Sequence, residues 1–79
     1  MIHKKGAQLY VTFYTSADAM ALERACRAAG LPGRLLPVPR SITSDCGVAW
    51  ATAPCQRAAL TVLLEQAHLE AAGIFETEE

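Results

Sequence analysis

The feature that most constrains the fold is a change of hydrophobic period near residue 15. Over residues 8–14, Leu9, Val11 and Phe13 occupy every second position. They alternate with Tyr10, Thr12 and Tyr14, and this period of two is typical of a β-strand. Thr15 and Asp18 then form the start signature of a helix, because a hydroxyl caps free N–H groups and an acid suits the first turn. Apolar residues recur at helical spacing until a glycine at position 30. The chain therefore opens with a strand followed at once by a helix.

The rest of the chain divides in the same way. Pro37 places the second strand at a sheet edge, because proline cannot donate to a ladder. Pro54 suits the first turn of a second helix. The predicted elements are a strand over 33–38, a loop over 39–47, a strand over 48–52, a helix from 54 to about 67 and a strand over 73–77.

The order β-α-β-β-α-β is that of the ferredoxin-like fold. Right-handed crossovers give a four-stranded antiparallel sheet in the order 4-1-3-2, with both helices on one face. We predict a single α+β domain over residues 1–79, with frayed ends at 1–6 and 78–79. Three connections then meet at one end of the sheet: 14–16, 39–47 and the turn that starts at His68.

Composition excludes several classes of function. A hydrophobic fraction of 52% against 19% charged residues excludes a disordered chain. A net charge of -1, with scattered basic residues, provides no footprint for nucleic acid. No window approaches the length of a membrane-spanning helix, and no apolar run of signal-peptide length precedes the polar residues Thr12 and Thr15. We therefore expect a cytoplasmic protein that binds neither nucleic acid nor membrane.

Three cysteines match neither a disulfide framework nor a zinc pattern, so we expect free thiols, no metal and no cofactor. Cys26 lies on the apolar stripe of the first helix and is predicted to be buried. Cys55 starts the second helix, where packing or capping is the simpler interpretation, although a helix terminus can activate a thiol. Trp50, on a central strand, is expected in the core or in a dimer interface.

Cys46 is the candidate reactive residue. It lies in the polar loop, at the end where the first helix begins, and free N–H groups there favour a thiolate. Gly47 allows close approach of the backbone. The candidate binding residues around the thiol are Arg40, Gly47, Ser16, Thr15 and His68.

The run Leu36-Pro37-Val38-Pro39-Arg40-Ser41-Ile42-Thr43-Ser44-Asp45-Cys46-Gly47-Val48-Ala49 resembles the signature of a family of small bacterial selenium/sulfur carrier-like proteins. Residues 13–16, 21–23 and 73–75 resemble other parts of that family. The resemblance implies a cytoplasmic thiol carrier in which the cysteine before glycine, here Cys46, holds sulfur or selenium. Pro39, Arg40 and Gly47 match the surrounding motif. The chain departs from the family at Trp50, where an aliphatic residue is expected, and in its cysteines at 26 and 55.

The leading hypothesis is a carrier or accessory protein rather than a turnover enzyme. Cys46 would receive sulfur or selenium from a donor protein as a persulfide-type adduct and pass it to an acceptor. The alternative is a regulatory module without thiol chemistry, in which Arg40 and the 39–47 loop bind a small anion or the sheet mediates a homodimer. A metal site of Cys46 with His68 lacks a second close ligand and is the weakest hypothesis.

Overall fold

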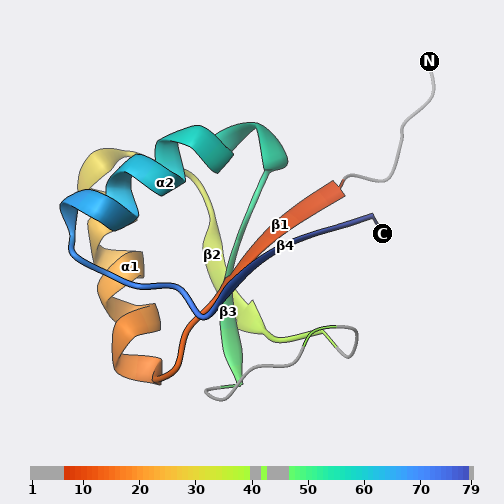
Figure 1. Ribbon diagram of the computed structural model, residues 1–79. Helices are drawn as coiled ribbons and strands as arrows, with labels where there is room; N and C mark the ends of the chain where they lie inside the picture. The colour runs from red at the N-terminus through yellow and green to blue at the C-terminus, as the bar shows by residue number, and fades with distance from the viewer. Residues whose placement is uncertain (1–6, 40–41, 43–46, 79) are drawn as a thin grey trace.

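The chain folds in the predicted order, and Figure 1 shows a four-stranded sheet with both helices packed on one face. The structure is a computed structural model that describes residues 7–39, 42 and 47–78. Its elements are β1 (Ala7–Thr12), α1 (Ser16–Ala29), β2 (Arg34–Pro37), β3 (Val48–Thr52), the 3-10 turn η1 (Pro54–Gln56), α2 (Arg57–Gln66) and β4 (Gly73–Glu78).

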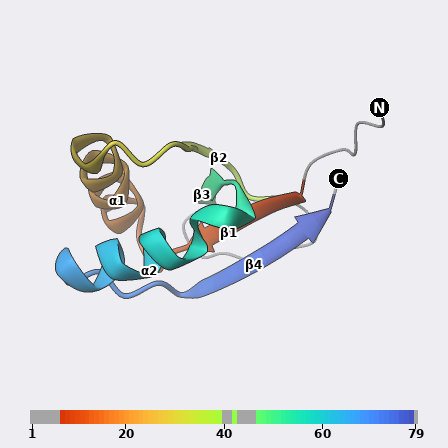
Figure 2. The same cartoon turned by 90° about the horizontal axis from the view of Figure 1, so that it is seen from above.

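The strands lie in the order β2-β3-β1-β4, and every neighbouring pair is antiparallel. Read from the other edge, this is the predicted order 4-1-3-2. β2 occupies an edge and contains Pro37, as the missing N–H of proline requires. The ferredoxin-like α+β fold is therefore confirmed, and the view from above in Figure 2 shows the two helices on the same side of the sheet.

The first helix has the caps that its sequence predicts. The Thr15 hydroxyl accepts a hydrogen bond from the backbone N–H of Asp18 at 3.2 Å. At the other end Gly30 adopts a left-handed φ of 75°, which a glycine reaches without steric cost. The second helix starts differently: a 3-10 turn precedes α2, and Ala53 before it has no side chain that could cap the free N–H groups.

The main core lies between the sheet and the helices. Trp50, at 1% exposure, is its largest side chain, as expected for a residue of the central strand β3. Full burial of one large apolar side chain stabilises a fold by about 1.5–3 kcal/mol, so this cluster is the main source of stability. The residues buried together are Leu9, Val11, Phe13, Ala19, Leu22, Cys26, Trp50, Leu60 and Leu64.

The opposite face of the sheet, here called the open face, carries a second and smaller cluster. Ile42 is only 7% exposed and packs with Tyr10, Ala49 and Ala51. The polar composition of the 39–47 loop predicts an exposed segment, and the burial of Ile42 departs from that prediction. The alanines of β3 have short side chains, and the room above them accommodates an aliphatic side chain from the loop.

Candidate functional site

The predicted convergence of connections is visible at the end of the sheet where β1 stops. Thr12 pairs with Ala49 of β3 on one side and with Gly73 of β4 on the other. The backbone N–H of Val38 donates to the carbonyl of Gly47 at 3.1 Å, which closes the neck of the loop at this same end. The connection after β1, the loop after β2 and the entry to β4 therefore lie together.

Two of the predicted site residues, Cys46 and Arg40, lie outside the described residues. Gly47, the next residue after Cys46, is exposed and has a left-handed φ of 80°. A Cβ at position 47 would meet no atom of the described residues within 4 Å, so the left-handed φ is the described feature that favours glycine there. Gly47 and its bond to Val38 are the described features of the structure nearest in the chain to the candidate thiol.

The start of α1 contributes a capped helix terminus to this end. The Thr15 oxygen is already engaged by the Asp18 N–H, and the Asp18 carboxylate belongs to the first turn. A negative charge in that position offsets part of the positive end of the helix dipole. Ser16 is exposed, and Tyr14 beside it is 55% exposed. The two candidate binding residues Thr15 and Ser16 therefore lie at the predicted end of the sheet.

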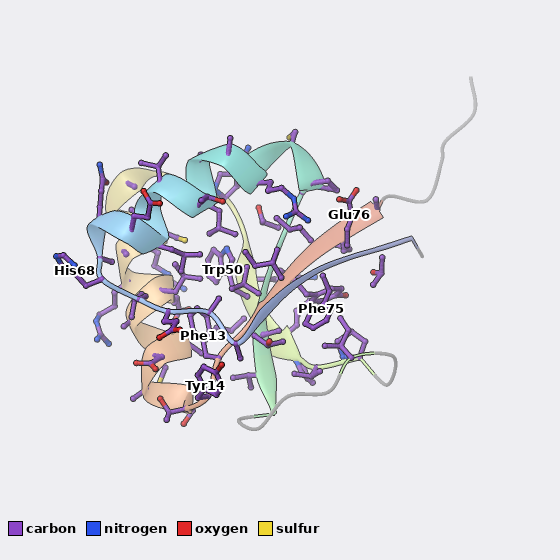
Figure 3. The ribbon with its side chains drawn as sticks, viewed as in Figure 1. Phe13, Tyr14, Trp50, His68, Phe75 and Glu76 are labelled. Atoms are coloured by element: carbon purple, nitrogen blue, oxygen red, sulfur yellow. The ribbon has the colours of Figure 1, made fainter. Side chains whose placement is uncertain are left out.

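His68 lies apart from those residues. Figure 3 shows its side chain pointing outward beyond α2, at a distance from Tyr14 and Phe13 at the lower end of the sheet. Its backbone has a left-handed φ of 57°, and its N–H donates to the Glu65 carbonyl at 3.2 Å. The chain reverses direction at His68, and residues 69–72 lead back to β4. His68 therefore lies at this turn and not near Tyr14 at the lower end of the sheet.

The two described thiols differ strongly. Cys26 is fully buried in the main core, and burial raises its pKa to about 11 because a thiolate is poorly solvated there. The predicted burial of Cys26 is therefore confirmed. Cys55 is exposed in η1, beyond the end of β3 that lies farther from Gly47. Neither thiol is placed at the convergent end of the sheet.

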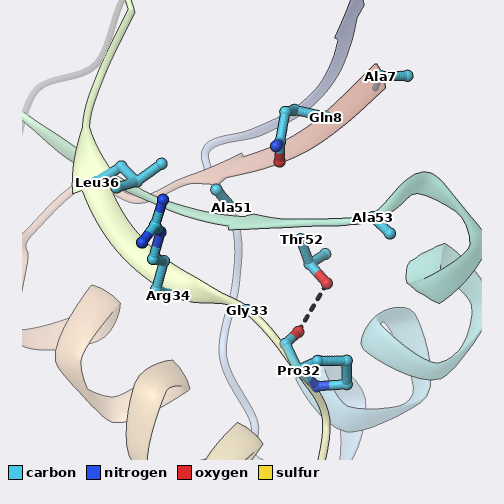
Figure 4. A pocket seen from close by; sticks show the side chains of 9 residues that line it. All are labelled: Ala7, Gln8, Pro32, Gly33, Arg34, Leu36, Ala51, Thr52 and Ala53. Carbon is cyan, nitrogen blue, oxygen red and sulfur yellow. Dashed lines mark hydrogen bonds between the residues drawn. The ribbon is translucent and has the colours of Figure 1, made fainter. Parts of the chain in front are cut away.

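A hollow of about 370 Å³ lies on the open face at the other end of the sheet, and sequence reasoning missed it (Figure 4). Ala51 forms part of its floor between the longer side chains of Gln8 and Arg34. The Thr52 hydroxyl donates to the Pro32 carbonyl at 2.7 Å beside it. The sequence feature that could have predicted the hollow is the alternation of small alanines at positions 49, 51 and 53. The lining residues are Ala7, Gln8, Pro32, Gly33, Arg34, Leu36, Ala51, Thr52 and Ala53.

Among the described residues, no three His, Cys, Asp or Glu side chains gather closely enough to hold a metal ion. Cys46, and with it the hypothesised pairing with His68, lies outside the described residues. Within the same described part of the chain, no helix has the length and hydropathy needed to cross a membrane.

The strand order, the two helices on one face and the loop between β2 and β3 define a small ferredoxin-like domain. The family model described as "Putative Se/S carrier protein-like" matches residues 8–76, and the chain belongs to this family. The match covers almost the whole domain and confirms the resemblance noted from the sequence. No curated protein and no solved structure matches the chain significantly.

Proposed function

We propose that this protein carries a sulfur or selenium atom on the Cys46 thiol, between a donor and an acceptor protein. The observation that carries the proposal is the family match over 8–76, a range that includes Cys46 and Gly47. A carrier of this kind needs an accessible thiol of low pKa and a surface for its partners. It has no substrate to turn over, so it acts as an accessory protein.

The chemistry is a pair of thiol exchanges. In loading, the Cys46 thiolate attacks the outer sulfur of a donor persulfide; a new S–S bond forms, the donor's S–S bond breaks, and the donor leaves as a thiolate. In delivery, an acceptor thiolate attacks the outer sulfur, and the Cys46 thiolate is the leaving group. Because the transferred sulfur keeps its oxidation state, neither step needs an oxidant or a reductant. A selenium atom in the outer position exchanges in the same way.

The environment of the other two cysteines supports the choice of Cys46. Cys26 has no exposed surface and a pKa near 11, so almost none of it is thiolate at neutral pH. Cys55 is exposed, yet it lies near the end of the sheet away from the loop that carries the family motif. Gly47 and the start of α1 lie at the end where that loop closes.

Intact-protein mass spectrometry after incubation with glutathione persulfide tests the proposal. We expect the wild type to gain the mass of one sulfur atom and to lose it again on reduction. Cys46→Ala should gain none, while Cys55→Ala, the matched control for an exposed thiol, should load like the wild type. Loading that persists in Cys46→Ala would refute the carrier role of Cys46.

A binding module is the second candidate, and the hollow on the open face favours it. Arg34 is exposed at the rim, makes no ion pair with any described residue, and faces the hollow together with Gln8. A guanidinium beside an amide suits a small carboxylate or phosphate. A rise in melting temperature with such anions that Arg34→Gln abolishes and Cys46→Ala leaves intact would favour this module.

A further inference from the structure

The two edges of the sheet differ in their protection against pairing with another chain. β2 is four residues long and contains Pro37, and short length and proline both block the addition of a strand. β4 is six residues long and contains no proline, and among the described residues it pairs with β1 alone. Figure 2 shows β4 along the margin of the sheet. The edge at β4 is therefore suited to receive a further strand.

The middle of β4 presents an aromatic side chain on the open face. Phe75 pairs with Tyr10 and is 38% exposed, and Figure 3 shows its ring on the side of the sheet away from the helices. The ring lies over Gly73, where an added Cβ would come within 2.7 Å of it. On the helix face, Ile74 packs against the main core and the Glu76 carboxylate lies 3.9 Å from Arg57.

We propose that β4 pairs with β4 of a second copy of this chain, so that two four-stranded sheets join about a twofold axis. Such an axis is perpendicular to the sheet and keeps each side chain on its own face. A residue can then pair only with a residue whose side chain lies on the same face. Because side chains alternate between faces, the two residue numbers in each pair are both odd or both even. Near the middle of the strand, this leaves Phe75 opposite itself or Glu76 opposite itself.

Charge decides between these two registers. Glu76 opposite Glu76 places like charges directly across the strands, which is destabilising. Phe75 opposite Phe75 brings two aromatic rings together on the open face, an arrangement that stabilises antiparallel pairs. The same register sets Ile74 opposite Glu76 of the second copy. The strand is thus complementary to itself in the register centred on Phe75.

The interface is small, because one strand edge and a few side chains carry it. Interfaces well below the usual 1,200–2,000 Å² or so of buried surface are weak and transient. We therefore expect a reversible dimer whose population grows with protein concentration. The pairing uses the outer edge of β4, and β1 lies between β4 and β3, the strand that follows Gly47. The dimer therefore does not depend on the proposed carrier function.

Sedimentation equilibrium over a range of concentrations tests the dimer. The average mass should rise from the chain's 8.5 kDa toward twice that value. Phe75→Glu places two carboxylates against each other at the axis and should weaken association about tenfold, because it both removes the aromatic pair and opposes like charges. Val62→Glu is the matched control, because Val62 is 52% exposed on α2 and receives the same change of charge.

Three results would overturn the proposal: a monomer's mass for the wild type at every concentration, association of Phe75→Glu equal to the wild type, or loss of association in Val62→Glu. Circular dichroism checks that each variant is folded. Phe75→Thr is the second variant, because threonine is a good strand former that removes the aromatic pair without adding charge. It should also weaken the dimer, and unchanged association would contradict the register.

Discussion

The indole of Trp50 lies against the backbone of Gly33, in the space that a side chain at position 33 would occupy. A Cβ there would lie 2.6 Å from Cζ2 of the indole and 2.7 Å from the carbonyl oxygen of Ala51. Gly33 also has a φ of 146°, a conformation that residues with a side chain rarely adopt. This contact joins the start of β2 to the largest side chain of the core.

Replacement of Gly33 by alanine should therefore destabilise the domain by about 1–3 kcal/mol, because neither the indole nor the Ala51 backbone can move aside freely. Urea denaturation measures the effect. Gly30→Ala is the control: its φ of 75° is also positive, but an added Cβ would meet no atom of the described residues within 4 Å. Equal losses in the two variants would show that backbone strain alone, and not contact with Trp50, requires the glycine at 33.

Stability should fall between about pH 9 and pH 11 through Cys26. Burial raises the pKa of this thiol from 9.0 to about 11, so in that window the unfolded chain has lost the proton that the folded chain retains. The contribution is complete below pH 9 and is lost as the pH passes the folded pKa. The measurement is the difference in unfolding free energy between wild type and Cys26→Ala. A difference that does not change across this window would contradict the assignment.

Cys26→Ser should cost about 1–3 kcal/mol, because it places a hydroxyl without a designated partner in the core. Cys46→Ser should change stability by no more than about 0.5 kcal/mol, as surface substitutions usually do. Thermal melts of both variants, combined with the persulfide loading assay, separate packing from chemistry. Unfolding of Cys46→Ser would mean that the residue has a structural role instead.

The three thiols should differ in their alkylation by iodoacetamide near neutral pH. We expect Cys46 to react fastest in single-cysteine variants, Cys55 next because it is exposed, and Cys26 slowest because it is buried with a raised pKa. Arg40→Ala should slow the reaction of Cys46, since we predict that this cation lies near the thiol and favours the thiolate. Faster reaction of Cys55 than Cys46 would show that the wrong thiol has been chosen, and an unchanged rate in Arg40→Ala would remove Arg40 from the site.

The N-cap of α1 should contribute about 1 kcal/mol, because the Thr15 hydroxyl satisfies the Asp18 N–H. Thr15→Ala removes that bond and should lower the unfolding free energy by this amount, while Thr15→Asn should retain most of it. Ser16→Ala serves as the neighbouring control, since Ser16 is exposed inside the first turn. If Thr15→Ala proved neutral, water would be an adequate substitute for the cap.

Local features of the sequence were sufficient to predict the elements and their order. Thr15 and Gly30 mark the two ends of α1 because capping depends on residues adjacent in the chain. Pro37 identified an edge strand because a missing N–H has the same consequence in any sheet. Once the order of elements was known, the handedness of crossovers left a single strand order to consider, and the structure has it.

Tertiary contacts determine three features that the local sequence pattern does not predict: the burial of Ile42, the hollow beside Arg34 and the position of His68. Ile42 is buried because the alanines of β3 leave room above the open face, and the hollow beside Arg34 remains where no side chain fills the same surface. His68 lies apart from Tyr14 because the chain turns outward before it returns to β4. Each of these outcomes depends on side chains far apart in the sequence that share a face or a space, a relationship that exists only after the strands have paired.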